Sequence, residues 1–206
     1  MIKDQTIELF LDQLASKSAT PGGGSAAAIM GSMGAALISM VCNLTIGKKN
    51  HETVEPEMKA VLVEAEQLRK ELLALVNQDV SVFDQVMAAY GLPKETDIEK
   101  SLRSQKIQEA LKAATEVPLL CASAAVKVIQ LSKAVAERGN KNVVSDAGVA
   151  VMAGMAAFKS AALNVHVNAG VIRDEVFVAS SLKQLNQLEE GLGLLVDSIY
   201  ATVRER

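Results

Sequence analysis

Aromatic residues are scarce in this sequence of 206 residues. It contains no Trp, two Tyr and four Phe, although half of its residues are hydrophobic. The core must therefore be built mainly from Ala, Leu, Val, Ile and Met, and of these Ala and Leu favour helices. Small residues also let neighbouring helices approach closely. This composition favours a helical protein with tightly packed helices.

Basic clusters and cysteines are also scarce. The formal net charge is −3 and no basic block is present, so the sequence shows no nucleic-acid-binding character. The two cysteines, Cys42 and Cys121, lie far apart and lack the spacing of a metal site. We interpret them as reduced core residues of a cytoplasmic protein. Near the N-terminus, Lys3, Asp4 and Glu8 interrupt the apolar segment that a signal peptide needs.

Charged residues are absent from residues 18–47, a stretch long enough to cross a membrane. The stretch is rich in Gly, Ala, Ser, Thr and Asn rather than in Leu and Phe, which weakens its insertion into a membrane. We therefore expect a buried helix of a soluble protein and no contact with a membrane.

The pattern of apolar residues and helix breakers predicts helices throughout. Strict alternation of apolar and polar residues, which is typical of strands, is scarce. Pro118 is expected to kink the fourth long helix or to start a new one. The sequence thus predicts an all-α, single-domain bundle over residues 1–206. The expected helices cover residues 2–16, 25–46, 56–90, 98–138, 144–171 and 174–206.

One acidic residue falls on an otherwise apolar helix face. In the helix predicted over residues 56–90, spacings of three and four place Asp79 between Val76 and Phe83 on the apolar stripe. An ionised carboxylate on a core face is costly unless it is paired or serves a function. Two interpretations stay open: Asp79 pairs with a neighbouring helix, or it is a general base with a raised pKa.

Three glycines precede the second long helix, in the segment PGGGS. Because Gly is a poor helix former, we expect Gly22, Gly23 and Gly24 to lie in a turn ahead of a helix that starts at Ser25. Free main-chain N–H groups at a helix start can bind an anion. The segment lacks the Lys-Ser/Thr ending of a phosphate-binding loop and follows no strand, so we expect no nucleotide. Close packing of another helix and approach of a ligand both explain the glycines.

Three further pairs of polar residues are candidates for a binding site. Two lysines after the second helix suit either the negative end of that helix or an anionic substrate. Two amides in LNVHVNA need hydrogen-bond partners, which are each other, the main chain or a heterocyclic ligand. A Ser-Asp pair in GNKNVVSDAGVA suits the capping of a helix, and a role in a site stays open. These pairs are Lys48 and Lys49, Asn164 and Asn168, and Ser145 and Asp146.

Four motifs together resemble one known family. They are TPGGGSAAAIMGSMGAALISMVCNLTIGKK, DVSVFDQVMAAYGLPK, GNKNVVSDAGVAV and SAALNVHVNA. Over essentially its whole length the sequence is similar to the cyclodeaminase/cyclohydrolase family of tetrahydrofolate enzymes. That family includes the C-terminal domain of formiminotransferase-cyclodeaminase and the stand-alone bacterial methenyltetrahydrofolate cyclohydrolase. The segments VCNLTIGKK and SDAGVAV resemble the stand-alone branch more closely.

The resemblance implies an all-helical homodimer that binds a folate. It implies that Asp79 is catalytic, with Phe83 completing the D-x-x-x-F segment of the family. It also assigns the remaining candidates to the folate site by position. These are Gly22, Gly23, Gly24, Ser25, Lys48, Lys49, Ser145, Asp146, Asn164 and Asn168.

The implied activity is hydrolysis of 5,10-methenyltetrahydrofolate to 10-formyltetrahydrofolate, with Asp79 as general acid and base. We expect no metal site and no cofactor beyond the folate substrate. The nearest alternative is formiminotetrahydrofolate cyclodeaminase, in which N10 attacks the formimino carbon and ammonia leaves. A hypothesis of a different class is a non-catalytic helical interaction module with a dimer face of small residues.

Overall fold

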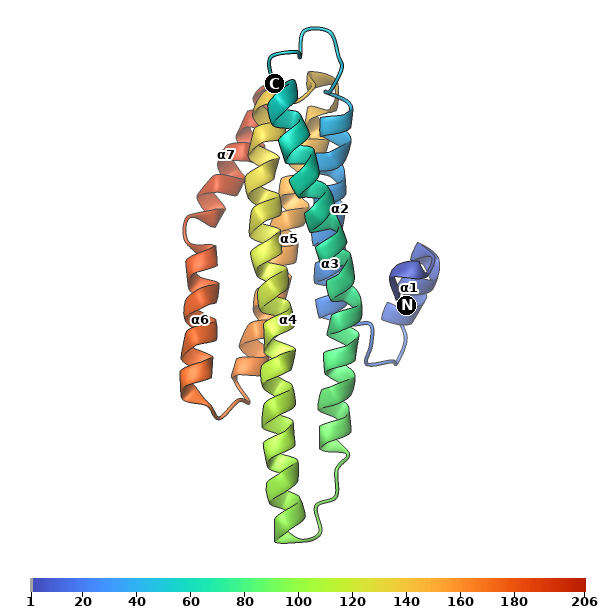
Figure 1. The fold of residues 1–206 in the computed structure, drawn as a ribbon, viewed down its shortest axis with the longest axis vertical. Coiled ribbons are helices and arrows are strands. Elements are labelled where there is room, and N and C mark those ends of the chain that lie inside the picture. The colour runs from blue at the N-terminus through green and yellow to red at the C-terminus, as the bar shows by residue number, and fades with distance from the viewer. Residues whose placement is uncertain (1) are drawn as a thin grey trace.

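The computed structural model describes residues 2–206, and every regular element within them is a helix (Figure 1). This confirms the all-α prediction. A 3-10 turn at Ile2–Asp4 precedes the first α-helix, where the sequence predicts one continuous helix, and a second 3-10 turn covers Lys141–Val143. The α-helices are α1 (Ile7–Leu14), α2 (Gly23–Asn43), α3 (Glu55–Tyr90), α4 (Asp97–Arg138), α5 (Val144–Ala169), α6 (Glu175–Glu189) and α7 (Leu192–Glu205).

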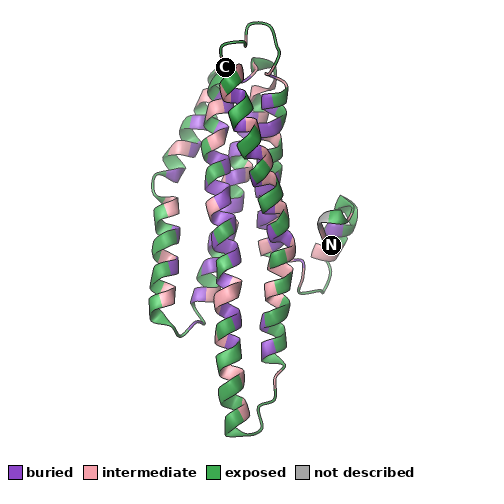
Figure 2. Ribbon diagram, viewed as in Figure 1, coloured by how far each residue is buried: buried purple, intermediate pink, exposed green. Residues whose placement is uncertain are grey.

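Four long helices, α2 to α5, pack side by side as the centre of the molecule (Figure 1). Helices α6 and α7 lie against α4 and α5, whereas α1 stands apart from the bundle. The α3–α4 hairpin extends beyond the other two central helices, and its far end is mostly exposed (Figure 2). A small apolar cluster, which includes Val86, Ile107 and Leu111, and hydrogen bonds from Arg103 to the Tyr90 carbonyl oxygen hold the two helices of this hairpin together there. Both cysteines are buried and free, as predicted.

Glycines set the distances between the central helices. A Cβ atom at Gly34 of α2 would lie 2.9 Å from Val128 Cγ1 and 3.0 Å from the Ala150 carbonyl oxygen. A Cβ atom at Gly154 of α5 would lie 2.9 Å from Ile129 Cγ1. Both contacts are too short for a real side chain, so α2, α4 and α5 approach as closely as they do only because these positions carry none.

The start of α2 differs from the prediction. Gly22 is the N-cap residue, and Gly23 and Gly24 form the first turn of the helix instead of lying ahead of it. Glycine is a poor helix former, so helix propensity disfavours it at these positions relative to alanine. The close contact of Gly24 with Asp79 of α3 outweighs that preference.

Helix α4 continues through Pro118 as one helix, so the prediction that a new helix starts there is wrong. A proline removes the N–H that would bond to the carbonyl four residues earlier, which here belongs to Ala114. The side-chain amide of Asn168 on α5 donates to that oxygen, with an N–O distance of 2.9 Å. A neighbouring side chain thus supplies the donor that the proline lacks.

The C-terminal region forms two helices, where the sequence predicts one. Helix α6 ends at Glu189, and Gly191 adopts a left-handed conformation with φ of 69° before α7 begins. Glycine reaches positive φ without steric cost, so the chain turns at this point and α7 follows the bundle.

Three helices, α2, α4 and α5, contain stretches long and apolar enough to cross a membrane by length and composition. In α2 and α4, 61% of the apolar stretch is buried inside the bundle, and in α5 the share is 44%. Most of the apolar character of α2 and α4 is thus explained by the core. The lower share in α5 leaves an apolar outer surface.

We expect the Gly34→Ala variant to lower the free energy of unfolding by about 1–3 kcal/mol, because the added methyl group meets the Ala150 main chain. Chemical denaturation measures this effect. Gly193→Ala in α7 is the matched control, since nothing lies within 4 Å of its added Cβ atom. Equal stability of the two variants would contradict the close approach of α2 to α5.

Candidate active site

Asp79 lies on α3 and faces the first turn of α2. The Ser25 hydroxyl donates to Asp79 Oδ2 at 2.8 Å, and the Ser25 main-chain N–H also bonds to this carboxylate. Ser25 is fully buried, with 0% of its surface exposed, and Asp79 is partly buried. The carboxylate therefore takes up two donors at the positive end of the helix, where a negative charge is favoured.

The contact of Gly24 with Asp79 explains why this position of the first turn carries no side chain. A Cβ atom at Gly24 would lie 2.1 Å from Asp79 Oδ1, so any other residue would displace the carboxylate. A Cβ atom at Gly23 would lie 3.9 Å from Asn164 Nδ2 of α5. The two adjacent glycines thus bring the main chain of α2 between the carboxylate of α3 and an amide of α5.

Burial sets the protonation behaviour of this group. It raises the pKa of Asp79 above its ordinary value, and the hydrogen bonds from Ser25 oppose the rise without cancelling it. Burial, together with the negative charge of Asp79, raises the pKa of the Cys121 thiol to about 12. Cys121 is therefore a neutral neighbour. A carboxylate with a raised pKa can accept and return a proton near neutral pH, as general acid–base catalysis requires.

Beyond Asp79 only α3 and α4 of the four central helices continue, because α2 begins there and α5 ends at Ala169. Helix α2 begins at the level of Asp79, whereas α3 continues to Tyr90, a further length of about 16 Å. Phe83 follows Asp79 one turn along α3 and is partly buried. The α4 residue Ala114 and the α5 residue Asn168 are joined by a hydrogen bond on the same side of the α2 start. Phe83 and Asn168 thus lie on α3 and α5 at the end of the bundle where α2 begins.

Both predicted amides bond to main-chain carbonyls. Asn164 Nδ2 donates to the Ser160 oxygen at 2.9 Å, within α5. Asn168 Nδ2 donates to the Ala114 oxygen of α4 at 2.9 Å. Both residues are partly buried. Of the partners that the sequence left open, the structure selects the main chain for the nitrogen of each amide.

Four of the candidate residues lie at the opposite end of the bundle. Helix α2 has 21 residues and is roughly 30 Å long, and the exposed Lys48 and Lys49 follow its far end. Asn140 bonds to Thr45 and Leu44 at that same end, which places the start of α5, with Ser145 and Asp146, there too. One chain therefore does not bring these four residues to Asp79. Within one chain the antiparallel packing of α2 and α5 holds them away from Asp79, and their assignment to the folate site stays a prediction.

The expected capping role of the Ser-Asp pair is also wrong. Helix α5 begins at Val144, and its N-cap residue is Val143, with no side-chain hydrogen bond. The side chain that accepts a main-chain N–H in this turn belongs to Asn140, which bonds to Asn142. The preceding 3-10 turn moves Ser145 and Asp146 into the helix.

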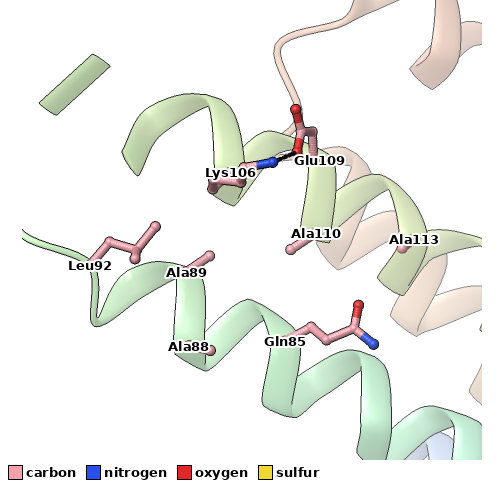
Figure 3. Close-up of a pocket in the computed structure, with 8 residues that line it drawn as sticks. All are labelled: Gln85, Ala88, Ala89, Leu92, Lys106, Glu109, Ala110 and Ala113. Carbon is pink, nitrogen blue, oxygen red and sulfur yellow. Dashed lines mark hydrogen bonds and ion pairs between the residues drawn. The ribbon is translucent and has the colours of Figure 1, made fainter. Parts of the chain in front are cut away.

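A pocket of about 390 Å³ opens between α3 and α4 farther along the hairpin (Figure 3). Its lining includes Gln85, Leu92 and the ion-paired Lys106 and Glu109, and it does not include Asp79. This pocket is shallow and lies beyond the region around Asp79. It contributes none of the predicted site residues.

Comparison with known proteins tests the family resemblance. The family model described as Formiminotransferase-cyclodeaminase matches residues 6–187. The chain belongs to the formiminotransferase-cyclodeaminase family. This confirms the resemblance that the four sequence motifs indicate.

Members of the formiminotransferase-cyclodeaminase family differ in length. Methenyltetrahydrofolate cyclohydrolase from Methylorubrum extorquens is 55% identical over 206 residues, which cover 100% of this chain and 99% of that protein. Formimidoyltransferase-cyclodeaminase from Gallus gallus is 35% identical over 181 residues, and the match covers 88% of this chain but 34% of that protein. The crystal structure of formiminotetrahydrofolate cyclodeaminase from Thermotoga maritima has a TM-score of 0.85 and 32% identity, and covers 100% of this chain and 96% of that chain.

Two features of this formiminotransferase-cyclodeaminase family member escape reasoning from the sequence. Cys121 gives no sequence signal that it neighbours Asp79, because the two lie on different helices. The hydrogen bond between Asn168 and Ala114 has a signal in hindsight. A proline inside a predicted helix leaves a carbonyl without its donor, and an amide on an apolar helix needs an acceptor.

We expect Asp79→Asn to raise the free energy of unfolding at pH 7–8. Burial raises the folded-state pKa, so the folded protein binds this proton more tightly than the unfolded chain does. Wild-type stability therefore falls as the pH rises from the ordinary Asp value of about 4 through the raised folded value. The variant escapes this loss, and its amide oxygen still accepts from Ser25.

Urea denaturation between pH 3.5 and 8 measures this difference, which should vanish at the acid end. Asp84→Asn, at an exposed position of the same helix, is the control and should follow the wild type. A lower free energy of unfolding for Asp79→Asn than for the wild type at pH 8 would show that the hydrogen bonds from Ser25 to the charged group outweigh its burial.

Proposed function

We propose that this protein is a methenyltetrahydrofolate cyclohydrolase, which hydrolyses 5,10-methenyltetrahydrofolate to 10-formyltetrahydrofolate. The relative of that name from Methylorubrum extorquens aligns over the full length of both chains. The structural observation that supports the proposal is the Asp79 carboxylate with a raised pKa at the glycine start of α2. We also propose a cytoplasmic enzyme that needs no cofactor beyond its folate substrate.

In the proposed mechanism Asp79 moves one proton. The carbon that bridges N5 and N10 of the substrate is part of a cationic amidinium group. A water molecule adds to this carbon as Asp79 takes one of its protons. Asp79 then gives this proton to N5 while the bond between the carbon and N5 breaks. The remaining hydroxyl proton goes to solvent as the formyl C=O forms on N10. Such proton transfer typically contributes 10²–10⁴-fold to the rate.

The charge of the substrate suits this position. A carboxylate close to the amidinium cation favours its binding electrostatically. The cation in turn stabilises the ionised form of Asp79, which is the form that accepts the proton from water. The buried donors from Ser25 keep the carboxylate in one orientation. The missing side chain of Gly24 leaves space for this carboxylate beside the main chain of α2.

The second candidate function is formiminotetrahydrofolate cyclodeaminase. It is favoured by the structural match to the cyclodeaminase from Thermotoga maritima over the whole of this chain. In that reaction N10 attacks the formimino carbon and ammonia leaves. The intermediate is again tetrahedral, so Asp79 could carry the proton in either reaction. The greater identity to the cyclohydrolase relative favours hydrolysis.

We further propose a homodimer that uses the outer surface of α2 and α5. This surface is apolar along both helices, and α2 carries no charged residue. A two-fold axis across the middle of α2 makes the two copies antiparallel, so the Lys48 end of one copy meets the Asp79 end of the other. The two groups of candidate residues, separated within one chain, then come together. The surface includes Met30, Met33, Leu37, Met40, Val149, Met152, Leu163 and Val167.

Loss of the methenyl chromophore in the presence of purified protein tests the activity. The wild type should bleach it faster than buffer does, and Asp79→Asn should reduce the rate by 10²–10⁴-fold. Asp84→Asn is the matched control and should retain full activity. Release of ammonia from 5-formiminotetrahydrofolate without bleaching would select the cyclodeaminase. Turnover of neither folate would favour the remaining hypothesis, a non-catalytic helical interaction module.

Light scattering of Met33→Lys tests the dimer. We expect a dimer mass for the wild type and a monomer mass for the variant, because a charge at the centre of an apolar interface is strongly unfavourable. Val63→Lys on α3 is the control, since Val63 is 69% exposed, compared with 58% for Met33, and lies outside the proposed surface. A wild type that is monomeric at micromolar concentration, or that requires detergent to stay in solution, would contradict the proposal.

A further inference from the structure

The hydrogen bond between Asn168 and Ala114 fixes the orientation of an amide next to the Asp79 region. A main-chain carbonyl can only accept a hydrogen bond, so the atom of Asn168 that faces it must be the amide nitrogen. Pro118 has no N–H to offer this carbonyl, and the N–O distance of 2.9 Å shows that Asn168 replaces it. The Asn168 oxygen is thus turned away from α4.

Asn164, one turn earlier on α5, also directs its nitrogen to a main-chain carbonyl, but this carbonyl belongs to α5 itself. Its nitrogen bonds to the Ser160 carbonyl oxygen at 2.9 Å, so its oxygen is also turned away from that acceptor. Asn164 lies beside Gly23, the residue next to the one that touches Asp79. Residues four apart on a helix lie on one face, with Cβ atoms about 5–6 Å apart. Both side chains thus lie on one face of α5, and no described residue donates a hydrogen bond to either amide oxygen.

We propose that Asn164 and Asn168 determine ligand specificity by accepting hydrogen bonds from a donor edge of a heterocycle. This inference rests on the proposed function, because it gives the orientation of the substrate in the same site. The 2-amino group and N3–H of a reduced pterin form such a donor edge. It lies across the two fused rings from N5, the atom that needs to be near Asp79. Asn168, the residue farther from Asp79, contacts the far edge of the ring.

The proposal gives Asn168 two separable tasks. Its nitrogen donates to the Ala114 carbonyl oxygen, which stabilises α4 at Pro118. Its oxygen accepts a hydrogen bond from the ligand. Asn168→Ala removes both groups. Asn168→Asp keeps acceptor oxygens but cannot donate to Ala114 once it is ionised. Pro118→Ala restores a main-chain N–H for Ala114 and so makes the side-chain nitrogen dispensable.

Calorimetric titration of the protein with two ligands tests the ligand contact. One ligand is 5-formyltetrahydrofolate, and the other is its analogue with a methyl group in place of the 2-amino group. We expect the wild type to bind the analogue roughly tenfold more weakly, the effect of one hydrogen bond. Asn168→Ala should weaken the parent roughly tenfold and the analogue less than twofold, whereas Asn168→Asp should keep the preference for the parent.

Thermal unfolding of the same variants tests the link to Pro118. Asn168→Ala should lower the Tm by about 2–4 °C in the wild-type background and by much less in the Pro118→Ala background. Asn164→Ala is the matched control. The Ser160 carbonyl does not depend on Pro118, so the effect of this control should be equal in both backgrounds.

Equal weakening of both ligands by Asn168→Ala would overturn the proposal, since the side chain would then not sense the 2-amino group. So would an equal loss of Tm in both backgrounds, because the nitrogen of Asn168 would not replace the missing donor. A wild type that binds neither ligand would overturn it as well. The expected ligand preference without any turnover would support the inference and contradict only the proposed catalytic function.

Discussion

The contact between the Asp79 carboxylate and the first turn of α2 constrains much of this structure. A carboxylate inside a helical bundle requires donors, and here Ser25 supplies its hydroxyl and its main-chain N–H. The carboxylate oxygen lies so close to Gly24 that no side chain fits there. Glycine, a poor helix former, stands at this helix position because any other residue would displace the charged group. A site that lowers local stability in this way is typical of functional residues.

Close packing of the helices also helps to place Asp79 against α2. The scarcity of aromatic residues leaves a core of small side chains, and glycines such as Gly34 and Gly154 let α2, α4 and α5 approach one another. Close packing brings the α2 main chain within reach of Asp79 and places Asn164 next to Gly23. It also fixes Cys121 near the carboxylate, where its neutral thiol adds no charge. Close helix packing thus sets the positions of several candidate site residues.

Asn168 and Pro118 show how a local irregularity becomes part of a site. The proline removes one hydrogen bond from α4, and the amide of α5 restores it from outside the helix. This exchange ties two helices together and turns the amide oxygen to a defined side. An ordinary residue at position 118 would keep the hydrogen bond inside α4 and leave the amide free to rotate.

The sequence by itself determined the helical class, the apolar stripe that contains Asp79 and the family, because these depend on composition, periodicity and local motifs. It could not determine which candidates meet. Gly24 and Asp79 are far apart in the chain and touch, whereas Lys48 follows the same helix as Gly24 and lies at its other end. Only the packing of α2, α3 and α5 decided this, since a rigid helix separates residues along its axis and antiparallel neighbours bring distant segments together. The helical role of Gly24 and the continuity of α4 through Pro118 were likewise tertiary outcomes, because each depends on a partner from another helix.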